Sequence, residues 1–266
     1  MGAGDIACEP SAGFGTTSCR HNVTSDQLAP ADAVLTFGDN QYEDGALSKF
    51  QASYGPTWGR WLSKTFPSVG NHEYLTADAA GHFDYFGARA GPRGQGWYAT
   101  RVGNWLLIAL NSNCSRVGGC GVNSPQWVWL RDLLAADTAP CVLAYQHHPR
   151  WAAGQYADHP QYDAIYRLLY ADHAELLLAG HDHNYQRWDR LNPDKQPDPT
   201  GIREIIAGTG GKNHTSVDPP PIPFRPVAND NTFGVLKLTL RAADYTWEFL
   251  PEPGKTFTDT GTEGCH

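Results

Sequence analysis

The chain has 266 residues, of which 41% are hydrophobic and 18% are charged, a composition that excludes a disordered chain. Its formal net charge of -8 provides no basic footprint, so nucleic acids and anionic membranes are not expected as partners. No apolar run approaches the ~20 residues that span a bilayer. Only about forty residues follow the Pro-rich segment 218–226, fewer than a usual domain holds. We therefore expect one domain over residues 1–266.

The predicted secondary structure alternates between strands and helices. Residues 34–37 form a short apolar run that is typical of a buried strand. The elements that follow are, in chain order, a hairpin of 97–102 and 105–110 across Gly103-Asn104, a helix over 125–136 that begins at Ser124-Pro125, a strand at 141–145, a helix opened by Pro160, a strand at 175–179, and a hairpin of 233–240 with 245–250. This order predicts a mixed α/β domain with layers of helix over sheet.

Polar side chains follow the apolar runs at the points where the predicted strands end. The carboxyl ends of neighbouring strands form the usual ligand crevice of layered α/β folds, so these donors are expected to gather there. They are Asp5, Asp39, Asn71, His147, His181 and His183. Six oxygen and nitrogen donors without a thiolate are too many for one tetrahedral zinc ion and suit two octahedral-type ions. Asp39 is the natural bridge, and such an ion pair clamps the two oxygens of an in-line displacement at phosphorus.

The ordered motifs resemble those of the calcineurin-like metallophosphoesterases. The matching segments are Asp5-Ile6-Ala7, Gly38-Asp39-Asn40-Gln41-Tyr42, Gly70-Asn71-His72-Glu73, His147 and Gly180-His181-Asp182-His183. The position of Tyr42 after Asp39 resembles the purple acid phosphatase branch. The resemblance implies an αββα fold, a two-sheet β-sandwich flanked by helices. It also implies a single catalytic domain over 1–266, without the extra N-terminal sandwich domain of large plant-type members.

The resemblance also implies a role for each matching residue. The first metal ion would be bound by Asp5, Asp39, Tyr42 and His183, and the second by Asp39, Asn71, His147 and His181. The phenolate of Tyr42 would favour Fe(III) at the first position, and the second ion would be divalent Fe, Zn or Mn. A metal-bound hydroxide would attack phosphorus, while His72 would neutralise the equatorial oxygens and serve as a proton donor to the leaving group.

Four other residues are expected near the ligands. His148, Glu73 and Asp182 are expected to support them from behind. His159 stands just before Pro160, and it either reaches the substrate as a second catalytic histidine or caps the helix there. The chain departs from the family pattern at Ala7, where this branch usually has glycine and other branches have histidine. That departure disfavours the cyclic-nucleotide phosphodiesterase branch.

Six cysteines, mostly in irregular segments, fit three disulfides in an oxidising compartment, with six free thiols as the alternative. The local pairs are Cys8 with Cys19 and Cys114 with Cys120, which leaves Cys141 and Cys265, although the sequence alone does not establish connectivity. The first residues do not form a signal peptide, which fits a cytoplasmic protein or one whose leader has been removed. The cysteines favour a secreted or periplasmic protein.

The leading functional hypothesis is a secreted phosphoesterase acting on small phosphate monoesters. The first alternative is a phosphodiesterase for nucleotides, lipid head groups or cell-wall polymers. The second is a non-catalytic metal- or ligand-binding protein that retains the fold, although no expected ligand is missing. Trp151, Tyr156 and His82 are predicted at the rim of the cleft, and the glycine-rich segment 208–212 beside it. The oligomeric state is not predicted.

Overall fold

The computed structural model describes residues 1–266, which form five α-helices and thirteen strands. The helices are α1 (His21–Asp26), α2 (Leu47–Lys49), α3 (Ala80–Phe86), α4 (Pro125–Ala136) and α5 (Asp163–Ala171). The strands are β1 (Gly2–Ala3), β2 (Val34–Phe37), β3 (Thr65–Ser68), β4 (Tyr98–Val102), β5 (Trp105–Ala109), β6 (Cys141–Tyr145), β7 (Leu176–Ala179), β8 (Tyr185–Leu191), β9 (Ile202–Ala207), β10 (Val227–Asn229), β11 (Gly234–Leu240), β12 (Asp244–Pro251) and β13 (Thr260–Gly264). None of the helices has the length and apolar character that a bilayer crossing requires.

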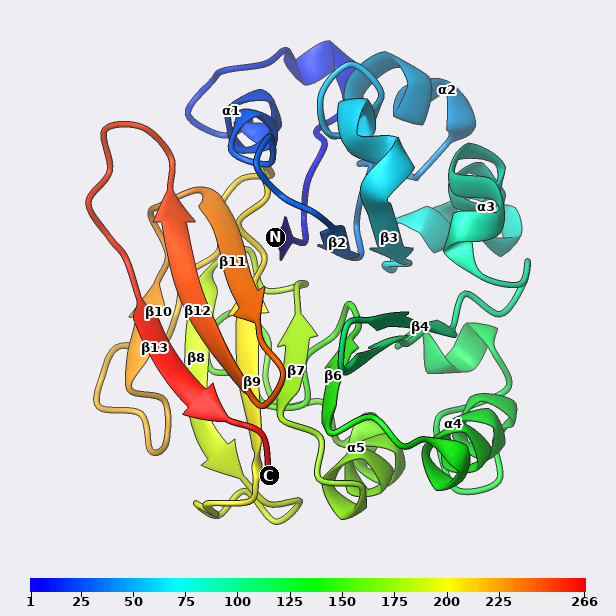
Figure 1. Ribbon diagram of the computed structural model, residues 1–266. Coiled ribbons are helices and arrows are strands. Elements are labelled where there is room, and N and C mark those ends of the chain that lie inside the picture. Colours follow the sequence, from blue (N-terminus) through cyan, green and yellow to red (C-terminus); the bar gives the residue numbers. More distant parts are fainter.

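Two mixed sheets pack against each other, with α1 to α3 outside one sheet and α4 and α5 outside the other (Figure 1). The first sheet has the order β13-β12-β11-β1-β2-β3, and the second has the order β10-β8-β9-β7-β6-β5-β4. Strands β1, β2 and β3 are parallel, as are β5, β6, β7 and β9. The predicted fold class, a two-sheet β-sandwich flanked by helices, is confirmed. Its parallel strands bring several carboxyl ends together, which positions the site described below.

Successive side chains of a strand point to opposite faces of its sheet, and this alternation divides the core into layers. In β5, Trp105 and Leu107 point into the space between the sheets, whereas Leu106 and Ile108 pack on the other face beneath α4 and α5. Strands β6 and β7 are covered on both faces, which explains their continuous apolar sequence. A third cluster, which includes Phe50, lies under α3 on the outer face of the first sheet.

The elements predicted from the sequence are present, with small differences at their ends. Ser124 caps α4, since its hydroxyl accepts a hydrogen bond from the backbone N–H of Trp127 at 3.4 Å. The helix opened by Pro160 begins with a 3₁₀ turn before α5. Strands β8, β9, β10 and β13 were not predicted. Strand β13 shows why: its sequence TGTEG has no apolar period, and it exists because it pairs with β12.

Three disulfides join Cys8 to Cys19, Cys114 to Cys120, and Cys141 to Cys265, and no cysteine is free. The prediction of three disulfides and the suggested pairing are confirmed. The first two bonds close short surface loops. The third links the start of β6 in the second sheet to the residue after β13 in the first, so it joins the two sheets at one end of the sandwich.

Two of the three predicted rim residues lie in the core instead. Trp151 is 3% exposed, packs against Tyr166 and carries the guanidinium of Arg150 on its face. His82 is 0% exposed and lies on α3 among aromatic rings, including Phe50. Both predictions were wrong because the position of a residue in or near a loop does not show whether other segments of the chain pack over its side chain. Tyr156 is partly exposed.

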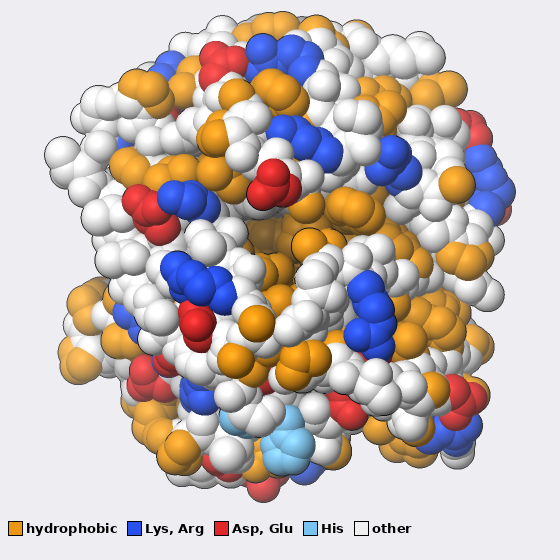
Figure 2. Space-filling model, in the orientation of Figure 1, with side chains coloured by type: hydrophobic (Ala, Val, Ile, Leu, Met, Phe, Trp, Pro, Cys, Tyr) orange, Lys and Arg blue, Asp and Glu red, His pale blue; other side chains and the backbone are white.

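A hollow opens between the sheets near the N-terminus, away from any cluster of polar ligands. Figure 2 shows this face, with a hydrophobic floor in the hollow at its centre. Met1 lies there and lines a cavity of about 270 Å³, whose other walls come mainly from apolar residues of both sheets, among them Leu35, Leu107 and Leu236. This cavity offers apolar contact rather than metal or phosphate ligands.

The burial of His82 predicts acid sensitivity of the fold. Burial lowers its pKa to about 3, and neither ring nitrogen has a hydrogen-bond partner. Between pH 6.5 and about 3 the unfolded chain binds the extra proton, so stability falls as the pH is lowered through this window. At pH 4.5, about two units below the unfolded pKa, this group should lower the free energy of unfolding by about 2–3 kcal/mol. The variant His82→Leu should remove that loss.

The test compares urea unfolding of the wild type and His82→Leu at pH 7 and pH 4.5. The matched control is His173→Asn, because His173 is exposed and its backbone φ of 59° suits asparagine. This control should keep the pH dependence of the wild type. An equal loss of stability on acidification in His82→Leu and in the wild type would contradict the assignment.

Candidate metal centre

Five parallel strands deliver the predicted ligands to one place. Asp5 follows β1, Asp39 follows β2 and Asn71 follows β3, all in the first sheet. In the second sheet, His147 follows β6, while His181 and His183 follow β7. Tyr42 lies in the loop after Asp39. All seven side chains predicted as ligands therefore meet across the two sheets, where their contacts form two groups.

The first group surrounds the phenolic oxygen of Tyr42. This hydroxyl lies 2.7 Å from Oδ1 of Asp5, 3.0 Å from Oδ2 of Asp39 and 2.9 Å from Nε2 of His183. His183 Nε2 is also 3.2 Å from Asp5 Oδ1. Four donor atoms from three loops thus converge on one point.

The second group surrounds Nε2 of His147. This atom lies 2.9 Å from Oδ1 of Asn71, 3.2 Å from Oδ2 of Asp39 and 3.3 Å from Nδ1 of His181. The same carboxylate oxygen of Asp39 takes part in both groups. The arrangement offers eight ligand positions from seven residues, with one carboxylate shared between the two halves.

The buried negative charges at this centre favour the binding of cations. Asp5 and Asp39 are 0% and 1% exposed, and neither forms an ion pair with a lysine or an arginine. Buried carboxylates are found paired or bound to metal, because an isolated buried charge is strongly disfavoured. Burial opposes the charged imidazolium of His147, but the carboxylate of Asp39 outweighs burial and raises the pKa of His147 to about 9. The donor set is hard, rich in oxygen and free of thiolate, so it fits two cations of the iron, zinc or manganese type.

The protonation of Tyr42 depends on what occupies the centre. Burial, followed by the negative charges of Asp39 and Asp5, raises the pKa of Tyr42 well above 10. Without a cation the side chain is therefore a neutral phenol that donates to the carboxylates. A multivalent cation among the same atoms reverses the sign of the local potential and favours the phenolate.

The backbone is strained where it presents these ligands. Asp5, Asp39 and His181 have φ values of 58°, 46° and 71°, in the left-handed region that non-glycine residues seldom adopt. Such conformations cost ~1–3 kcal/mol each and cluster at functional sites. The positive φ of His181 makes the turn that lets His181 and His183 serve the same centre. Gly180 instead permits close approach, since a Cβ there would lie 2.6 Å from Asp5 Oδ2.

Glu73 connects two of the ligand loops. Its carboxylate accepts hydrogen bonds from the backbone N–H groups of Gly70 at 2.6 Å, Asn40 at 2.7 Å and Gln41 at 3.1 Å. Burial and the nearby charge of Asp39 raise the pKa of Glu73 to about 8. Glu73 thereby ties the loop that carries Asn71 to the loop that carries Asp39, and it does not point at the centre itself.

His148 and Asp182 lie beside the ligands. The ring of His148 is 4.3 Å from that of His181, and its Nδ1 is 2.8 Å from Oγ of Ser112. Asp182 is buried and accepts a hydrogen bond from Nε2 of Gln186 at 3.1 Å. Burial raises the pKa of Asp182 to about 7. His148 contacts the ring of a proposed ligand, while the support of the ligands by Asp182 stays a prediction.

His72 and His159 border the centre on different sides. The backbone N–H of His72 donates to Asp39 at 2.8 Å, its Nδ1 contacts the carbonyl of Glu43, and its Nε2 is 3.9 Å from Asp39 Oδ2. The ring of His159 lies 5.4 Å from that of His181, with a buried Nε2 that has no partner. His159 makes no side-chain capping bond to the helix at Pro160, so capping does not account for its position.

Several supporting groups had no signal in the sequence. Backbone carbonyls accept from two of the imidazoles: His147 Nδ1 donates to Phe37 O at 2.9 Å, and His183 Nδ1 donates to Asn213 O at 2.6 Å. These bonds turn Nε2 of each ring toward the centre. Any residue can supply a carbonyl, so no residue type marks such a position. Tyr156 stacks on His181 with ring centroids 4.3 Å apart, as its predicted place at the rim allows.

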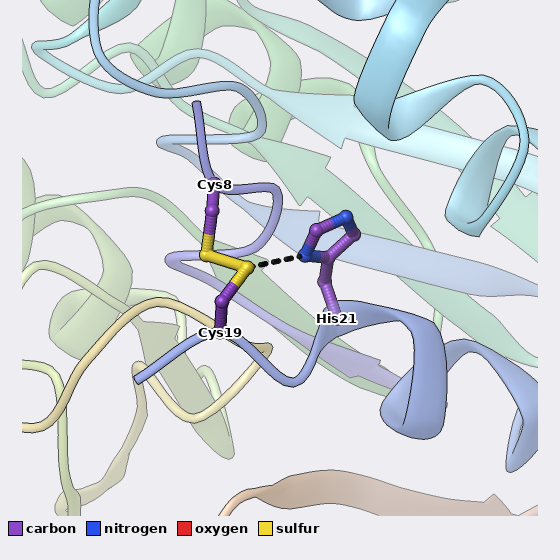
Figure 3. A group of neighbouring side chains, drawn as sticks. All are labelled: Cys8, Cys19 and His21. Carbon is purple, nitrogen blue, oxygen red and sulfur yellow. Dashed lines mark hydrogen bonds between the residues drawn. A yellow bond between two sulfur atoms is a disulfide. The ribbon is translucent and has the colours of Figure 1, made fainter. Parts of the chain in front are cut away.

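The segment 208–212 borders the centre through Lys212, whose Nζ lies 4.7 Å from the ring centroid of Tyr42 and pairs with Glu43. A separate group of potential ligands, Cys8, Cys19 and His21, lies next to the same part of the chain (Figure 3). Its two sulfur atoms form a disulfide, and His21 Nδ1 lies 3.3 Å from Cys19 Sγ. With no thiolate available, this group is a packed disulfide rather than a metal site.

A sandwich with two four-donor groups sharing a carboxylate at its strand ends is the architecture of a metallophosphoesterase. The chain belongs to the calcineurin-like phosphoesterase family, whose model matches residues 20–185. It is 23% identical over 184 residues to Fe(3+)-Zn(2+) purple acid phosphatase 12 of Arabidopsis thaliana, a match that covers 60% of this chain and 38% of the relative. It is 24% identical over 218 residues to purple acid phosphatase 15 of the same plant, covering 68% and 40%. The chain thus spans about 40% of the length of these curated relatives.

Solved structures share the fold. Purple acid phosphatase PPD1 from yellow lupin seeds has a TM-score of 0.77 at 17% identity, covering 98% of this chain and 52% of that one. GAP50, described as the anchor in the inner membrane complex of Plasmodium, has a TM-score of 0.68 at 14% identity, covering 97% and 86%. The predicted resemblance to the purple acid phosphatase branch is confirmed.

The geometry predicts that Asn71 contributes to one half of the centre only. In Asn71→Ala, protein stripped of metal and then titrated with Zn²⁺ should lose affinity in one of two binding events. The loss should reach at least the roughly 10–100-fold that removal of an outer partner of a metal ligand causes. Calorimetry and elemental analysis measure the affinity and the number of ions. The control is Asn104→Ala at the exposed β4–β5 turn, which should bind like the wild type. Unchanged binding in Asn71→Ala would exclude this residue as a ligand.

Proposed function

We propose that this chain is a dinuclear metal-dependent phosphatase that hydrolyses phosphate monoesters. The observation that carries the proposal is the shared carboxylate of Asp39, whose Oδ2 lies 3.0 Å from Tyr42 Oη and 3.2 Å from His147 Nε2. A carboxylate placed between two donor groups is suited to bridge two ions, and paired ions are the recurring solution to phosphoryl displacement. Membership of the calcineurin-like phosphoesterase family supports the same conclusion.

The two halves of the centre differ in the ions they favour. Asp5, Asp39, Tyr42 and His183 would hold Fe(III), because a phenolate is a hard, anionic ligand. Asp39, Asn71, His147 and His181 would hold a divalent ion, for which zinc, iron and manganese are the candidates. The name of one Arabidopsis relative, an Fe(3+)-Zn(2+) enzyme, supports an unequal pair of this kind.

When bound, such ions lower the pKa of a water molecule toward neutrality and offset the charge of the phosphoryl oxygens. The chain's own part is to orient substrate and to supply protons. The contact of His72 Nδ1 with the Glu43 carbonyl leaves Nε2 facing the centre, within reach of a phosphoryl oxygen. The leaving alkoxide departs opposite the attacking oxygen and takes its proton from His72. Burial and the charge of His147 lower the pKa of His159 to about 4, so its neutral ring orients the substrate rather than supplying the proton.

The position of His72 should make hydrolysis of monoesters faster than hydrolysis of diesters. A monoester has three non-bridging oxygens and a diester has two. If two oxygens face the ions, only the monoester offers a third to His72. A hydrogen bond to a charged group is worth ~1.5–3 kcal/mol, so we expect the monoester to react at least about tenfold faster.

The test measures kcat/KM for 4-nitrophenyl phosphate and bis(4-nitrophenyl) phosphate with metal-reconstituted protein. Monoester preference is the expected result, and Asn71→Ala should abolish both reactions. A preference for the diester would leave the assignment of the metal centre intact, but the substrates would then be phosphodiesters of nucleotides, lipid head groups or cell-wall polymers. Two bound ions with neither reaction would contradict the proposal and favour a binding role. The fold does not exclude that role, since one protein that shares it is described as an anchor.

The colour of the protein tests Fe(III) at the Tyr42 position. A phenolate bound to Fe(III) absorbs visible light, so the iron-loaded wild type should be coloured and Tyr42→Phe should lose the band. The variant Tyr98→Phe is the control, since Tyr98 donates to the carbonyl of Pro67 and contributes nothing to the centre. A colourless, fully active wild type would show that both ions are divalent.

We also propose that the protein works in an oxidising compartment, secreted or periplasmic. The support is that all six cysteines are paired, an arrangement that reducing cytosol disfavours.

A further inference from the structure

A second cavity adjoins the candidate metal centre. It has a volume of about 490 Å³, within the range of small-molecule sites. Asn71 and His148 belong both to the surroundings of the centre and to the wall of this cavity. The remaining wall comes from Tyr74 and Leu75 after the Asn71 loop, from residues 112–116, and from the turn at Gln161 and Tyr162. A phosphate ester bound at the centre therefore has an adjacent space for its leaving group.

The charge of this wall is unusual for the chain. The sequence contains 28 acidic and 20 basic residues, yet the wall has one arginine, Arg116, and no lysine, aspartate or glutamate. Arg116 makes no ion pair and no side-chain hydrogen bond, although most arginines of this chain are paired with a carboxylate. The guanidinium is thus free to bind an anion in the cavity.

The backbone that carries Arg116 is constrained before any ligand arrives, while its side chain is exposed. Its residue lies inside the loop closed by the Cys114–Cys120 disulfide, and its backbone N–H donates to Asn113 O at 2.8 Å. The guanidinium carbon lies 5.9 Å from the ring centroid of Tyr74, within the range of a cation–π contact. That ring is itself held, because its hydroxyl accepts a hydrogen bond from Asn111 at 2.8 Å. Because the loop backbone is already constrained, little backbone freedom is lost when Arg116 binds an anion, and the entropic cost is lower.

We propose that this cavity is a subsite for the leaving group and that it selects phosphate monoesters whose organic part carries a second anionic group, a carboxylate or another phosphate. Arg116 binds that group. The exposed side chain of Leu75 and the rings of Tyr74 and Tyr162 contact the carbon skeleton, and the amide of Gln161 faces its polar atoms. This inference rests on the proposed phosphatase function and names the class of substrate.

The experiment compares phenyl phosphate with its 3-carboxyphenyl and 4-carboxyphenyl analogues. The measured quantity is the ratio of kcat/KM for the better carboxylated substrate to kcat/KM for phenyl phosphate. The wild type should prefer the carboxylated substrate, and Arg116→Ala should lower the ratio by about fivefold, the upper end for one exposed charge pair. Arg116→Lys should retain part of the preference, and added salt should weaken it in the wild type.

The control is Arg131→Ala on α4, an exposed arginine that lies outside the cavity wall and should leave the ratio unchanged. Equal ratios in the wild type and Arg116→Ala would overturn the subsite while leaving the phosphatase function intact. The absence of any hydrolysis in the wild type with both ions bound would instead overturn the proposed function, and the subsite with it.

Discussion

Two carboxylates held out of water, those of Asp5 and Asp39, impose the constraint on which the structure of the centre depends. Neither has a lysine or arginine partner, and the basic side chains that face them are the imidazoles of His147, His183 and, at 3.9 Å, His72. The first two of these rings are in turn oriented by the backbone carbonyls of Phe37 and Asn213. A cluster of this kind is unfavourable in an empty protein and favourable around cations, which is why its geometry argues for metal more strongly than any single residue does.

The architecture supplies the rigidity that such a cluster requires. Parallel strands of two sheets end at the same place, and the loops that follow them are strained, with positive φ at Asp5, Asp39 and His181. The buried carboxylate of Glu73 then binds three backbone N–H groups and locks two of those loops together. Loops fixed in this way hold the ligand side chains at constant distances, which a dinuclear centre requires. The neighbouring loop around Arg116 is also constrained, since the Cys114–Cys120 disulfide closes it.

The predicted residues that meet at the centre are marked by local pattern and chemistry, whereas those that were predicted wrongly depend on contacts with distant parts of the chain. Six of the seven proposed ligands are chemically distinctive residues at the ends of apolar runs, so the strand pattern indicated them. The seventh, Tyr42, was indicated only by the resemblance to the family motif. Trp151 and His82 were expected at the rim because of their chemistry and position, yet both are buried by contacts that come from elsewhere in the chain. Strand β8 was missed for a related reason. Its sequence YQRWDRL mixes polar and apolar residues, and the pairing with β9 and β10 makes it a strand.

The sequence by itself determined a mixed α/β domain, the main helices and strands of the core, and the order of the donor residues, because these depend on local hydrophobic period and on residue chemistry. The two-sheet sandwich was expected only from the resemblance of its motifs to a known family. Only the tertiary structure decided that the two donor groups share one oxygen of Asp39 and that His181 makes the turn at its own position. It also decided that Arg116 stands unpaired on the wall of a cavity beside Asn71. Those features depend on distances between segments far apart in the chain, and such distances arise only when the two sheets pack.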